Sequence, residues 1–335
     1  MEPIRVLLLR SESHDPSPMD QSLGARLSAL HGPGSSLLVV EEEHFRREDF
    51  SGMETKLALR RGKISGVIGA TNVPESARLG ELAAQMNLLC FVANNNPLVW
   101  QGRKHVFHIG LPSPQTAEAV ATLLQRAQCR RIFLLYDPTE FQSRVASSME
   151  TALTGRGMKV NSQPASADGT FELLREWQAD LIYVIFSSEQ KALPVARRIR
   201  ERVKTIPLLF GRSLLRESFL SSLDENTGES WFVDMFHRNG TQTESQLPFM
   251  RALSAQGISI PTANHAFGWD AMSFCALALK AAQGEPSSAV DHLDSGVMLE
   301  GAAGTCSFSR DNHNGRSGFG PTTLTRWING RLEEV

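Results

Sequence analysis

The strongest constraint on this chain is a regular alternation of short apolar segments with longer amphipathic ones along its length. Residues 131–136, which are apolar after Arg131, and residues 181–186 are runs of strand length, typical of strands that are buried on both faces of a parallel sheet. Residues 190–202 have instead the apolar spacing of a helix that covers a sheet with one side. Strands that alternate with helices predict an α/β chain with open parallel sheets and helices on both faces.

The same patterns extend along the rest of the chain. Strands are expected at residues 4–9, 37–42, 66–70, 88–93, 105–110, 131–136, 159–160, 181–186, 207–210, 231–234, 304–309 and 324–328, and helices at 75–86, 116–127, 142–155, 171–178, 190–202, 244–256, 267–282 and 287–293. Because these strands are too many for one sheet, two lobes are predicted. Residues 1–112 and 240–306 are expected in the first lobe, and residues 113–239 and 307–335 in the second. The pair Asn329-Gly330 predicts a hairpin turn near the end of the chain.

The composition excludes several classes of protein. With 335 residues, of which 41% are hydrophobic, the chain is long enough for a sizeable core in each lobe. Its 34 basic and 36 acidic residues give a net charge of −2, so neither nucleic acid nor a membrane surface is expected as a partner. No apolar run approaches the ~20 residues that span a bilayer, so membrane insertion is not expected either.

The four cysteines, Cys90, Cys129, Cys275 and Cys306, are widely separated and form no Cys-x-x-Cys pair. Most of them lie in apolar patterns that are typical of a core. We therefore expect reduced, buried thiols rather than disulfides or a zinc site.

The sequence motifs of common catalytic and cofactor sites do not occur, among them GxGxxG, GxxxxGKS/T, GxSxG and HExxH. His105 and His108 are three residues apart on a predicted strand, where they face opposite sides, so we expect structural histidines rather than metal ligands. Residues 311–314 predict a capped loop, and residues 239–241 predict a polar hinge loop. No enzyme, cofactor or metal is therefore predicted.

Polar residues follow four of the predicted strands, at the positions where open α/β sheets bind ligands. The loop 71–76 precedes a helix, whose first N–H groups suit an anion such as a carboxylate. The loop 94–97 offers amide donors and acceptors, and the pairs 187–188 and 212–213 end two later strands. Helix capping or turn formation is the alternative for each of these segments.

Several motifs occur in a recognisable order: Gly66-Val67-Ile68-Gly69-Ala70, residues 83–91, Asn96-Pro97, residues 105–109, residues 131–137, residues 179–183, Gly268-Trp269-Asp270-Ala271, and residues 301–308 ahead of Asp311-Asn312-His313. In this order and spacing they resemble the type I periplasmic-binding fold, in its branch that binds branched-chain amino acids and amides. The resemblance covers essentially the whole chain. It implies two Rossmann-like lobes that are joined by three crossovers and have a ligand cleft between them.

The resemblance also implies which residues contact the ligand. The matching positions are Asn72, Val73, Ala93, Asn94 and Asn95 in the first lobe, and Phe141, Ser187, Arg212 and Ser213 in the second. Family members hold a carboxylate or amide head group at the positions of Val73, Ala93 and Asn95, and Phe141 matches an aromatic wall. Asn95→Ala is accordingly expected to weaken binding by roughly 1–3 kcal/mol. One of the residues Ser11, Glu12 and Ser13 is also expected to line the cleft.

Two positions depart from the family pattern. Val73 replaces a usual serine, which leaves only its backbone for hydrogen bonding. Ser213 stands where amino-acid binders have an acid for the ammonium group of the ligand, and an unpaired buried ammonium would cost several kcal/mol. Arg212, which exchanges roles with Ser213 in an alignment shifted by one residue, offers a cation for a second anionic group. An uncharged amide, or a carboxylate without an amine, is therefore expected as the ligand, and Phe141 favours an aromatic one.

The favoured interpretation is a solute-binding protein of an ABC-type importer, which captures a small polar solute by hinge closure and has a membrane permease as its partner. The alternative is a ligand-sensing regulator, or the input domain of a receptor, on the same fold. The chain passes from Met1-Glu2-Pro3 directly into a strand. The expected location is therefore the periplasm with the signal sequence removed, or else the cytoplasm.

Overall fold

The computed structural model describes residues 3–12, 16–94, 96–167, 169–223, 227–236, 242–316, 322–328 and 330–335. Contacts divide the chain into two compact units, Met1–Pro112 with Gln242–Gly320, and Ser113–Thr241 with Pro321–Val335. We call these units lobe I and lobe II. Each is an α/β unit on a mainly parallel sheet, as predicted.

The sheet of lobe I has five parallel strands in the order β2-β1-β3-β4-β5. The strands are β1 (Ile4–Glu12), β2 (Leu38–Arg46), β3 (Gly66–Gly69), β4 (Leu89–Val92) and β5 (Val106–His108). Because they are parallel, their carboxyl ends share one edge of the sheet, and this edge carries the candidate loops. A separate antiparallel hairpin joins β11 (Met298–Gly301) to β12 (Gly304–Ser307).

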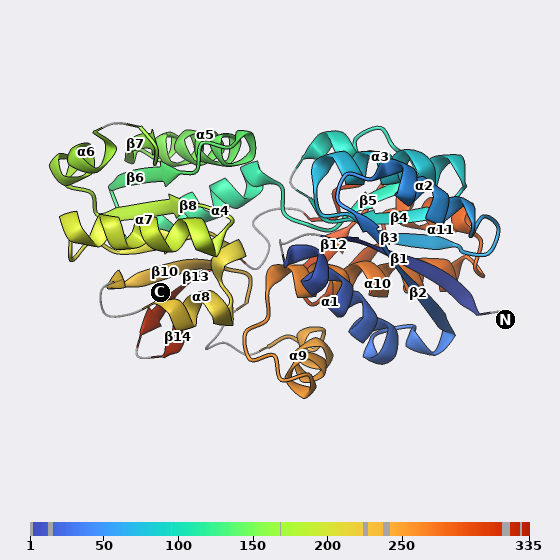
Figure 1. Cartoon of the computed structure of the whole chain (residues 1–335). Helices are drawn as coiled ribbons and strands as arrows, with labels where there is room; N and C mark the ends of the chain where they lie inside the picture. The colour runs from blue at the N-terminus through green and yellow to red at the C-terminus, as the bar shows by residue number, and fades with distance from the viewer. Residues whose placement is uncertain are drawn as a thin grey trace. The chain divides into compact units, whose positions relative to one another are not determined.

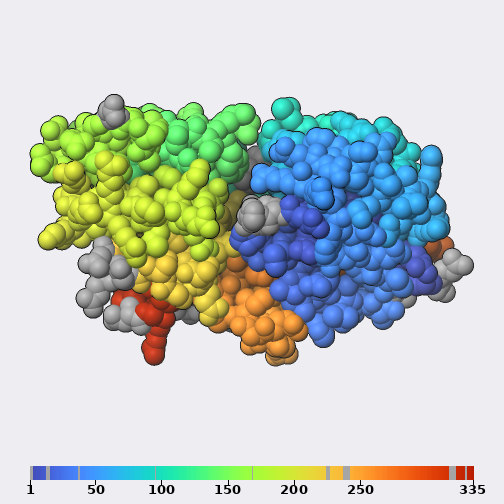
Figure 2. All heavy atoms as spheres, in the orientation of Figure 1, coloured from blue at the N-terminus to red at the C-terminus, as the bar shows by residue number. Residues whose placement is uncertain are grey.

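Helices cover both faces of this sheet (Figure 1). The helices α2 (Phe50–Ala58) and α3 (Val73–Gln85) lie on one face, and α1 (Ser17–His31), α10 (Ala263–Ala281) and α11 (Pro286–Asp294) lie on the other. The helix α9 (Gln246–Ala255) packs beside α1, and both helices contribute to the surface that Figure 2 shows in orange and dark blue. The single-turn helix η2 (Pro97–Val99) follows β4.

The helix α1 is not predicted by the sequence, because its buried face carries mostly small or polar residues while Met19 and Leu30 are exposed, which leaves no amphipathic stripe. Two glycines allow its close approach to α10. A methyl group on Gly24 would lie 1.9 Å from the carbonyl oxygen of His265, and one on Gly268 would lie 1.9 Å from that of Gln21. The backbones of the two helices are therefore in direct contact.

The sheet of lobe II has the order β14-β13-β10-β9-β8-β6-β7. Its strands are β6 (Arg131–Tyr136), β7 (Lys159–Pro164), β8 (Leu181–Ile185), β9 (Leu208–Phe210), β10 (Ser230–Asp234), β13 (Thr323–Ile328) and β14 (Arg331–Glu334). The first five of these strands are parallel, whereas β13 and β14 pair antiparallel. Ile328 and Arg331 are paired across the predicted hairpin turn.

The helices α4 (Ser113–Arg126) and α5 (Glu140–Gly155) pack on one face of this sheet. The helices α7 (Glu189–Arg202) and α8 (Glu217–Ser222) lie on the opposite face, with α6 (Thr170–Trp177) beside α7 (Figure 1). Helices on both faces leave the loops at the carboxyl ends of the strands as the accessible polar edge of lobe II.

One predicted boundary is wrong: residues 307–316, expected in the second lobe, pack in lobe I. Phe308 is buried there, with its ring centre 6.0 Å from that of Phe91 and 5.3 Å from that of Phe107. The strand predicted at residues 304–309 is found as β12 (Gly304–Ser307), which ends just before Phe308. The apolar pattern of this segment could not indicate which of the two cores would receive Phe308.

A buried ion pair anchors the same segment. The carboxylate of Asp270 accepts the N–H groups of Ala302 at 2.6 Å and Ala303 at 3.0 Å, and it accepts a hydrogen bond from Arg316 at 2.8 Å. Arg316 also donates to the carbonyl groups of Ile109 and Ala303. Both charged side chains are fully buried, so each serves as the counter-ion of the other.

All four cysteines are buried and free, as predicted. Burial raises the pKa of Cys90 and of Cys306 to about 12, so these thiols stay protonated and unreactive at neutral pH. Within the described parts of the chain, no helix has both the length and the hydropathy needed to span a bilayer.

Candidate functional site

The loop between β3 and α3 holds the first candidate residues at the carboxyl edge of the lobe I sheet. Asn72 is the N-cap of α3, and its Oδ1 accepts the N–H of Glu75 at 2.9 Å. The Oδ1 of Asn72 therefore caps the helix, which is the alternative role that the sequence allowed for this loop. Pro74 has no N–H, and the N–H of Glu75 is capped. In the first turn of α3, the N–H of Val73 therefore has no acceptor within the helix itself.

Asn94 follows β4 and shows the clearest sign of a binding role. Its side chain is buried, and its Oδ1 accepts the N–H of Asn96 at 2.9 Å. Its Nδ2 has no hydrogen-bond partner among the described residues. Since a buried donor without an acceptor costs roughly 1–3 kcal/mol, this nitrogen is suited to an acceptor from outside the fold. Ala93 beside it is buried as well, whereas Asn95 lies outside the described residues.

A buried histidine holds Asn94 in place. The Nε2 of His108 donates to the backbone carbonyl of Asn94 at 2.5 Å, and its Nδ1 lies 2.8 Å from the Oδ1 of Asn314. The ring stacks on Trp100 with 3.8 Å between the ring centres. His108 thus has the structural role that the sequence predicts.

The other histidine of this strand pattern, His105, is half-buried at the start of β5, and burial together with the charge of Lys104 lowers its pKa. Among the described residues, no group of three His, Cys, Asp or Glu side chains could hold a metal ion.

Glu75 is a buried carboxylate that sequence reasoning missed. Its Oε1 accepts hydrogen bonds from the hydroxyl of Ser11 at 3.0 Å and from the N–H of Glu48 at 2.9 Å. Its Oε2 has no partner within the described part of the chain. Glu75 therefore ties the ends of β1 and β2 to α3 and leaves one acceptor unused at the same edge as Asn94.

Lobe II brings together candidates from the ends of β8 and β9. The Oγ of Ser213 donates to the carbonyl oxygen of Phe186 at 3.4 Å, which puts it next to Ser187. Ser187 is exposed, and Phe141, in the first turn of α5, is 37% exposed despite its large apolar ring. Both side chains are therefore accessible to a small molecule.

Arg212 adds a cation at the end of β9. Its Nη1 lies 3.7 Å from the sulfur of Met235. Burial raises the pKa of Tyr183 to about 12, and the nearby charge of Arg212 opposes this rise. The Tyr183 hydroxyl and the Ser213 Oγ would lie 3.8 and 3.9 Å from a methyl group on Gly211. The end of β9 thus combines a cation with two hydroxyl groups, of which the sequence indicated only that of Ser213.

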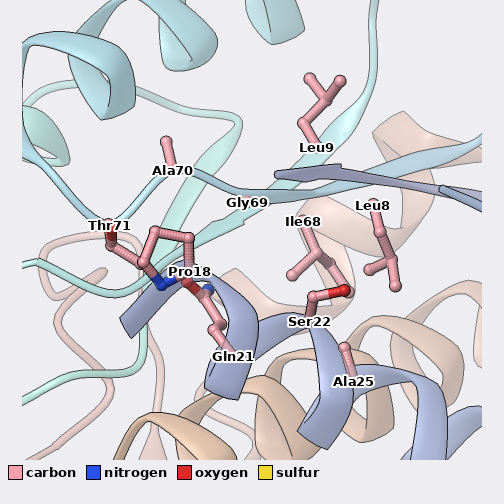
Figure 3. A pocket seen from close by; sticks show the side chains of 10 residues that line it. All are labelled: Leu8, Leu9, Pro18, Gln21, Ser22, Ala25, Ile68, Gly69, Ala70 and Thr71. Carbon is pink, nitrogen blue, oxygen red and sulfur yellow. The ribbon is translucent and has the colours of Figure 1, made fainter. Parts of the chain in front are cut away.

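Lobe I also contains a small pocket between α1, the middle of β1 and the carboxyl end of β3 (Figure 3). It is lined by Leu8, Leu9, Pro18, Gln21, Ser22, Ala25, Ile68, Gly69, Ala70 and Thr71. The pocket has space for about one water molecule. Its rim residues Ala70 and Thr71 directly precede Asn72, so the pocket and the head-group candidates belong to one edge of the sheet.

A family model described as periplasmic binding protein matches residues 54–330. The chain belongs to this family. The fold and the family are thus those that the sequence motifs indicated. A search of curated proteins finds no match.

Solved structures of low sequence identity share the fold over nearly the whole chain. A leucine-binding protein, LivK of Thermotoga maritima, is 17% identical with a TM-score of 0.78, covering 100% of this chain and 98% of LivK. The branched-chain amino acid binding protein LivJ of Streptococcus pneumoniae, solved with isoleucine, is 17% identical with a TM-score of 0.79, covering 100% and 99%. An ABC transporter solute-binding protein of R. palustris, solved with benzoate, is 15% identical with a TM-score of 0.78, covering 99% and 95%.

Proposed function

We propose that this periplasmic binding protein is the solute-binding component of an ABC-type importer, and that its solute has a carboxylate or amide head group. The observation that supports this most directly is the buried Nδ2 of Asn94, which has no partner among the described residues. The N–H of Val73 is a second donor, in the first turn of α3, and α3 follows β3, the strand that pairs with β4.

Both donors favour an oxygen acceptor, and the first turn of a helix favours a negatively charged one. Leucine, isoleucine and benzoate, named for the proteins of similar fold, all have a carboxylate. A carboxylate head group on the edge of lobe I is therefore the interpretation that both lines of support share.

The second lobe favours a solute without an amine. Ser213 offers a hydroxyl group where a ligand ammonium would require an acid, and Arg212 beside it is a cation. An ammonium group placed beside Arg212 would be repelled by its charge, and Ser213 offers no carboxylate to pair with it. The exposed ring of Phe141 adds an apolar surface that suits an aromatic or aliphatic body.

The proposal includes capture of the solute by closure of the two lobes, a periplasmic location and a membrane permease as the partner. Residue roles follow from it: Asn94 and Val73 bind the head group, with Asn72 as the cap that orients the helix start, and Ala93 and Asn95 complete the same loop. Arg212, Ser213, Ser187 and Phe141 contact the rest of the solute.

A thermal-shift screen of the purified protein tests the proposed solute class. The panel is benzoate, isovalerate, benzamide, leucine, isoleucine and valine. A solute present at 100 times its Kd stabilises the protein by about 2.7 kcal/mol, which raises the Tm by several degrees. We expect benzoate or isovalerate to raise the Tm and the three amino acids to have no effect, and titration calorimetry then gives the Kd.

If an amino acid raises the Tm and the simple carboxylates do not, another acid pairs with the ammonium group and the proposed solute class is wrong. Steady turnover of a bound compound would instead make the protein an enzyme.

A further inference from the structure

The pocket under α1 contains a donor that nothing in the described part of lobe I satisfies. Gln21 is 4% exposed, and its Nε2 has no hydrogen-bond partner among the described residues. In Figure 3 its side chain extends from α1 toward Pro18 and Thr71, on the wall of the pocket. A buried amide without a partner lowers stability, so its presence indicates an acceptor that is not part of the fold.

One other buried polar side chain lines the pocket, that of Ser22, and it already has a partner. The hydroxyl of Ser22 donates to Glu42 at 2.5 Å. Glu42 in turn forms ion pairs with Arg10 at 3.2 Å and Arg26 at 3.6 Å. The amide of Gln21 is therefore the buried polar group that is left to bind a solute atom, and the hydroxyl of Thr71 lies at the rim.

The remaining wall is apolar, with Leu8, Ile68 and Ala25 opposite the amide. Because the space holds about one water molecule, it fits one oxygen atom with its hydrogen but not a carboxylate or a ring. An apolar wall with one donor selects a neutral acceptor, since a charged group would be desolvated without a counter-ion.

The backbone that carries the donor is held rigidly. The carbonyl oxygen of Gln21 is in contact with Gly268 of α10, where a methyl group would lie only 1.9 Å away. The backbone that carries the amide therefore cannot shift without moving α10. A donor on an immobile backbone discriminates between solutes more strongly than a donor on a mobile segment.

We infer that this pocket is a subsite for one oxygen atom of the solute, a hydroxyl or a keto oxygen, which accepts a hydrogen bond from Gln21. The inference rests on the proposed function, because it takes the head group to be bound by Asn94 and Val73 on the same edge of the sheet. It narrows the solute from carboxylates in general to hydroxy or keto carboxylates.

The test compares solutes that differ by one oxygen. Calorimetry measures the Kd of benzoate and of each monohydroxybenzoate, and of isovalerate and its hydroxy and keto derivatives. The proteins are the wild type, Gln21→Met, which keeps the length of the side chain without the amide, and Gln21→Asn, which withdraws the donor by one methylene group. Ser28→Ala is the matched control, because it removes a buried hydrogen bond of α1, to Ser273 at 2.7 Å, away from the pocket.

We expect the wild type to bind one oxygenated member at least roughly tenfold more tightly than its parent carboxylate. Both Gln21 variants should bring this ratio close to one and leave the Kd of the parent unchanged. The Tm of ligand-free Gln21→Met should equal or exceed that of the wild type, whereas Ser28→Ala should have a lower Tm and an unchanged ratio.

Each other outcome has a definite meaning. If carboxylates bind but the ratio survives in Gln21→Met, or if no oxygenated member is preferred, the subsite is wrong and the proposed function stands. If ligand-free Gln21→Met loses stability as Ser28→Ala does, Gln21 is a structural residue. If no carboxylate or amide binds to the wild type, the proposed function is wrong and the inference fails with it.

Discussion

At the scale of single residues, two side-chain amides share an uncommon property. Asn94 and Gln21 are both buried, and each has a nitrogen without an acceptor among the described residues. Buried polar groups in proteins are hydrogen-bonded in the large majority of cases, so two such donors near one sheet edge are more than packing errors. Under the proposed function, they are the two positions at which the solute would supply the missing acceptor.

Asn94→Asp tests the donor without removing the turn. The variant keeps the Oδ1 that accepts from Asn96, but it replaces Nδ2 by a second, negatively charged oxygen. We expect the affinity for a carboxylate such as benzoate to fall at least about tenfold, because a hydrogen bond becomes a repulsion. Titration calorimetry at pH 7 measures the change.

Asn96→Asp is the matched control for this variant, since the Oδ1 of Asn96 also accepts a backbone N–H, that of Leu98 at 3.1 Å. It should leave binding nearly unchanged. Equal losses in the two variants would mean that added charge, and not the missing donor, weakens binding.

Only part of the candidate site could be predicted from the sequence. Asn94 follows a recognisable strand, so its place at the carboxyl edge is visible in the chain. Glu75, three residues after Asn72, looks like the second half of a capping box. Its side chain instead contacts Ser11, 64 residues away in the sequence. Gln21 could not be singled out, because its meaning depends on what α10 and the sheet leave unfilled around it.

At the scale of elements, the contact between α1 and α10 determines where one wall of the pocket stands. Gly268→Ala would put a methyl group 1.9 Å from the carbonyl oxygen of Gln21, against backbone that cannot rotate away. We expect a loss of at least about 3 kcal/mol in the free energy of unfolding, because the helices must separate. Urea denaturation measures this loss.

Gly155→Ala, in the last turn of α5, is the matched control, since no atom lies within 4 Å of the added methyl group. It should be neutral or slightly stabilising, because alanine loses less backbone entropy than glycine on folding. A Gly268→Ala protein as stable as the wild type would show that the two backbones are not in contact.

Glu42 on β2 interacts with side chains of β1 and α1, and these interactions predict that the stability of the protein depends on pH. Burial alone would raise the pKa of Glu42, but the hydrogen bond from Ser22 and the charges of Arg26 and Arg10 outweigh it, so the pKa lies below its ordinary value of 4.5. A carboxyl group with a lowered pKa in the folded state stabilises the protein above its unfolded pKa. This stabilisation is lost as the pH falls through the folded pKa.

Glu42→Gln should therefore be about 1–2 kcal/mol less stable than the wild type at pH 7. The difference should shrink as the pH falls from about 5 to about 3. Glu54→Gln, whose exposed carboxylate pairs with Arg78, should change stability by less than about 0.5 kcal/mol at either pH. A gap between Glu42→Gln and the wild type that persists at pH 3 would contradict the assigned charge.

The elements themselves were predictable where one physical signal dominated. The mainly apolar segment 131–136 predicted β6 with the bounds that the structure has. The helices α1, α2 and α8 were missed, and α1 shows the reason. Apart from Leu27, its buried residues are small or polar, because its backbone lies against that of α10. Tertiary packing, not hydrophobic periodicity, decides such a helix.

At the scale of the whole molecule, the reaction rate of the four buried thiols measures how often the protein unfolds. Burial raises the pKa of every cysteine, to about 11 for Cys129 and about 12 for Cys90 and Cys306. Since the thiolate is the reactive form, iodoacetamide at pH 8 should modify the native protein far more slowly than the urea-unfolded one. Mass spectrometry counts the modified thiols, and Cys129, which is 8% exposed, should be the first to react. One thiol that reacts rapidly in the native protein would contradict its burial.

The contact between α1 and α10 also has a consequence for how the protein is made. Ser28 and Ser273, which meet in that contact, are 245 residues apart in the chain. At about 5–20 residues per second, a ribosome needs roughly 10–50 seconds to travel from one to the other. Throughout that interval the apolar face of the first sheet, with Leu8 and Ile68, has no α10 to cover it. The newly made chain therefore has an exposed apolar surface that is prone to aggregation for most of its synthesis, and we expect it to require a chaperone during this time.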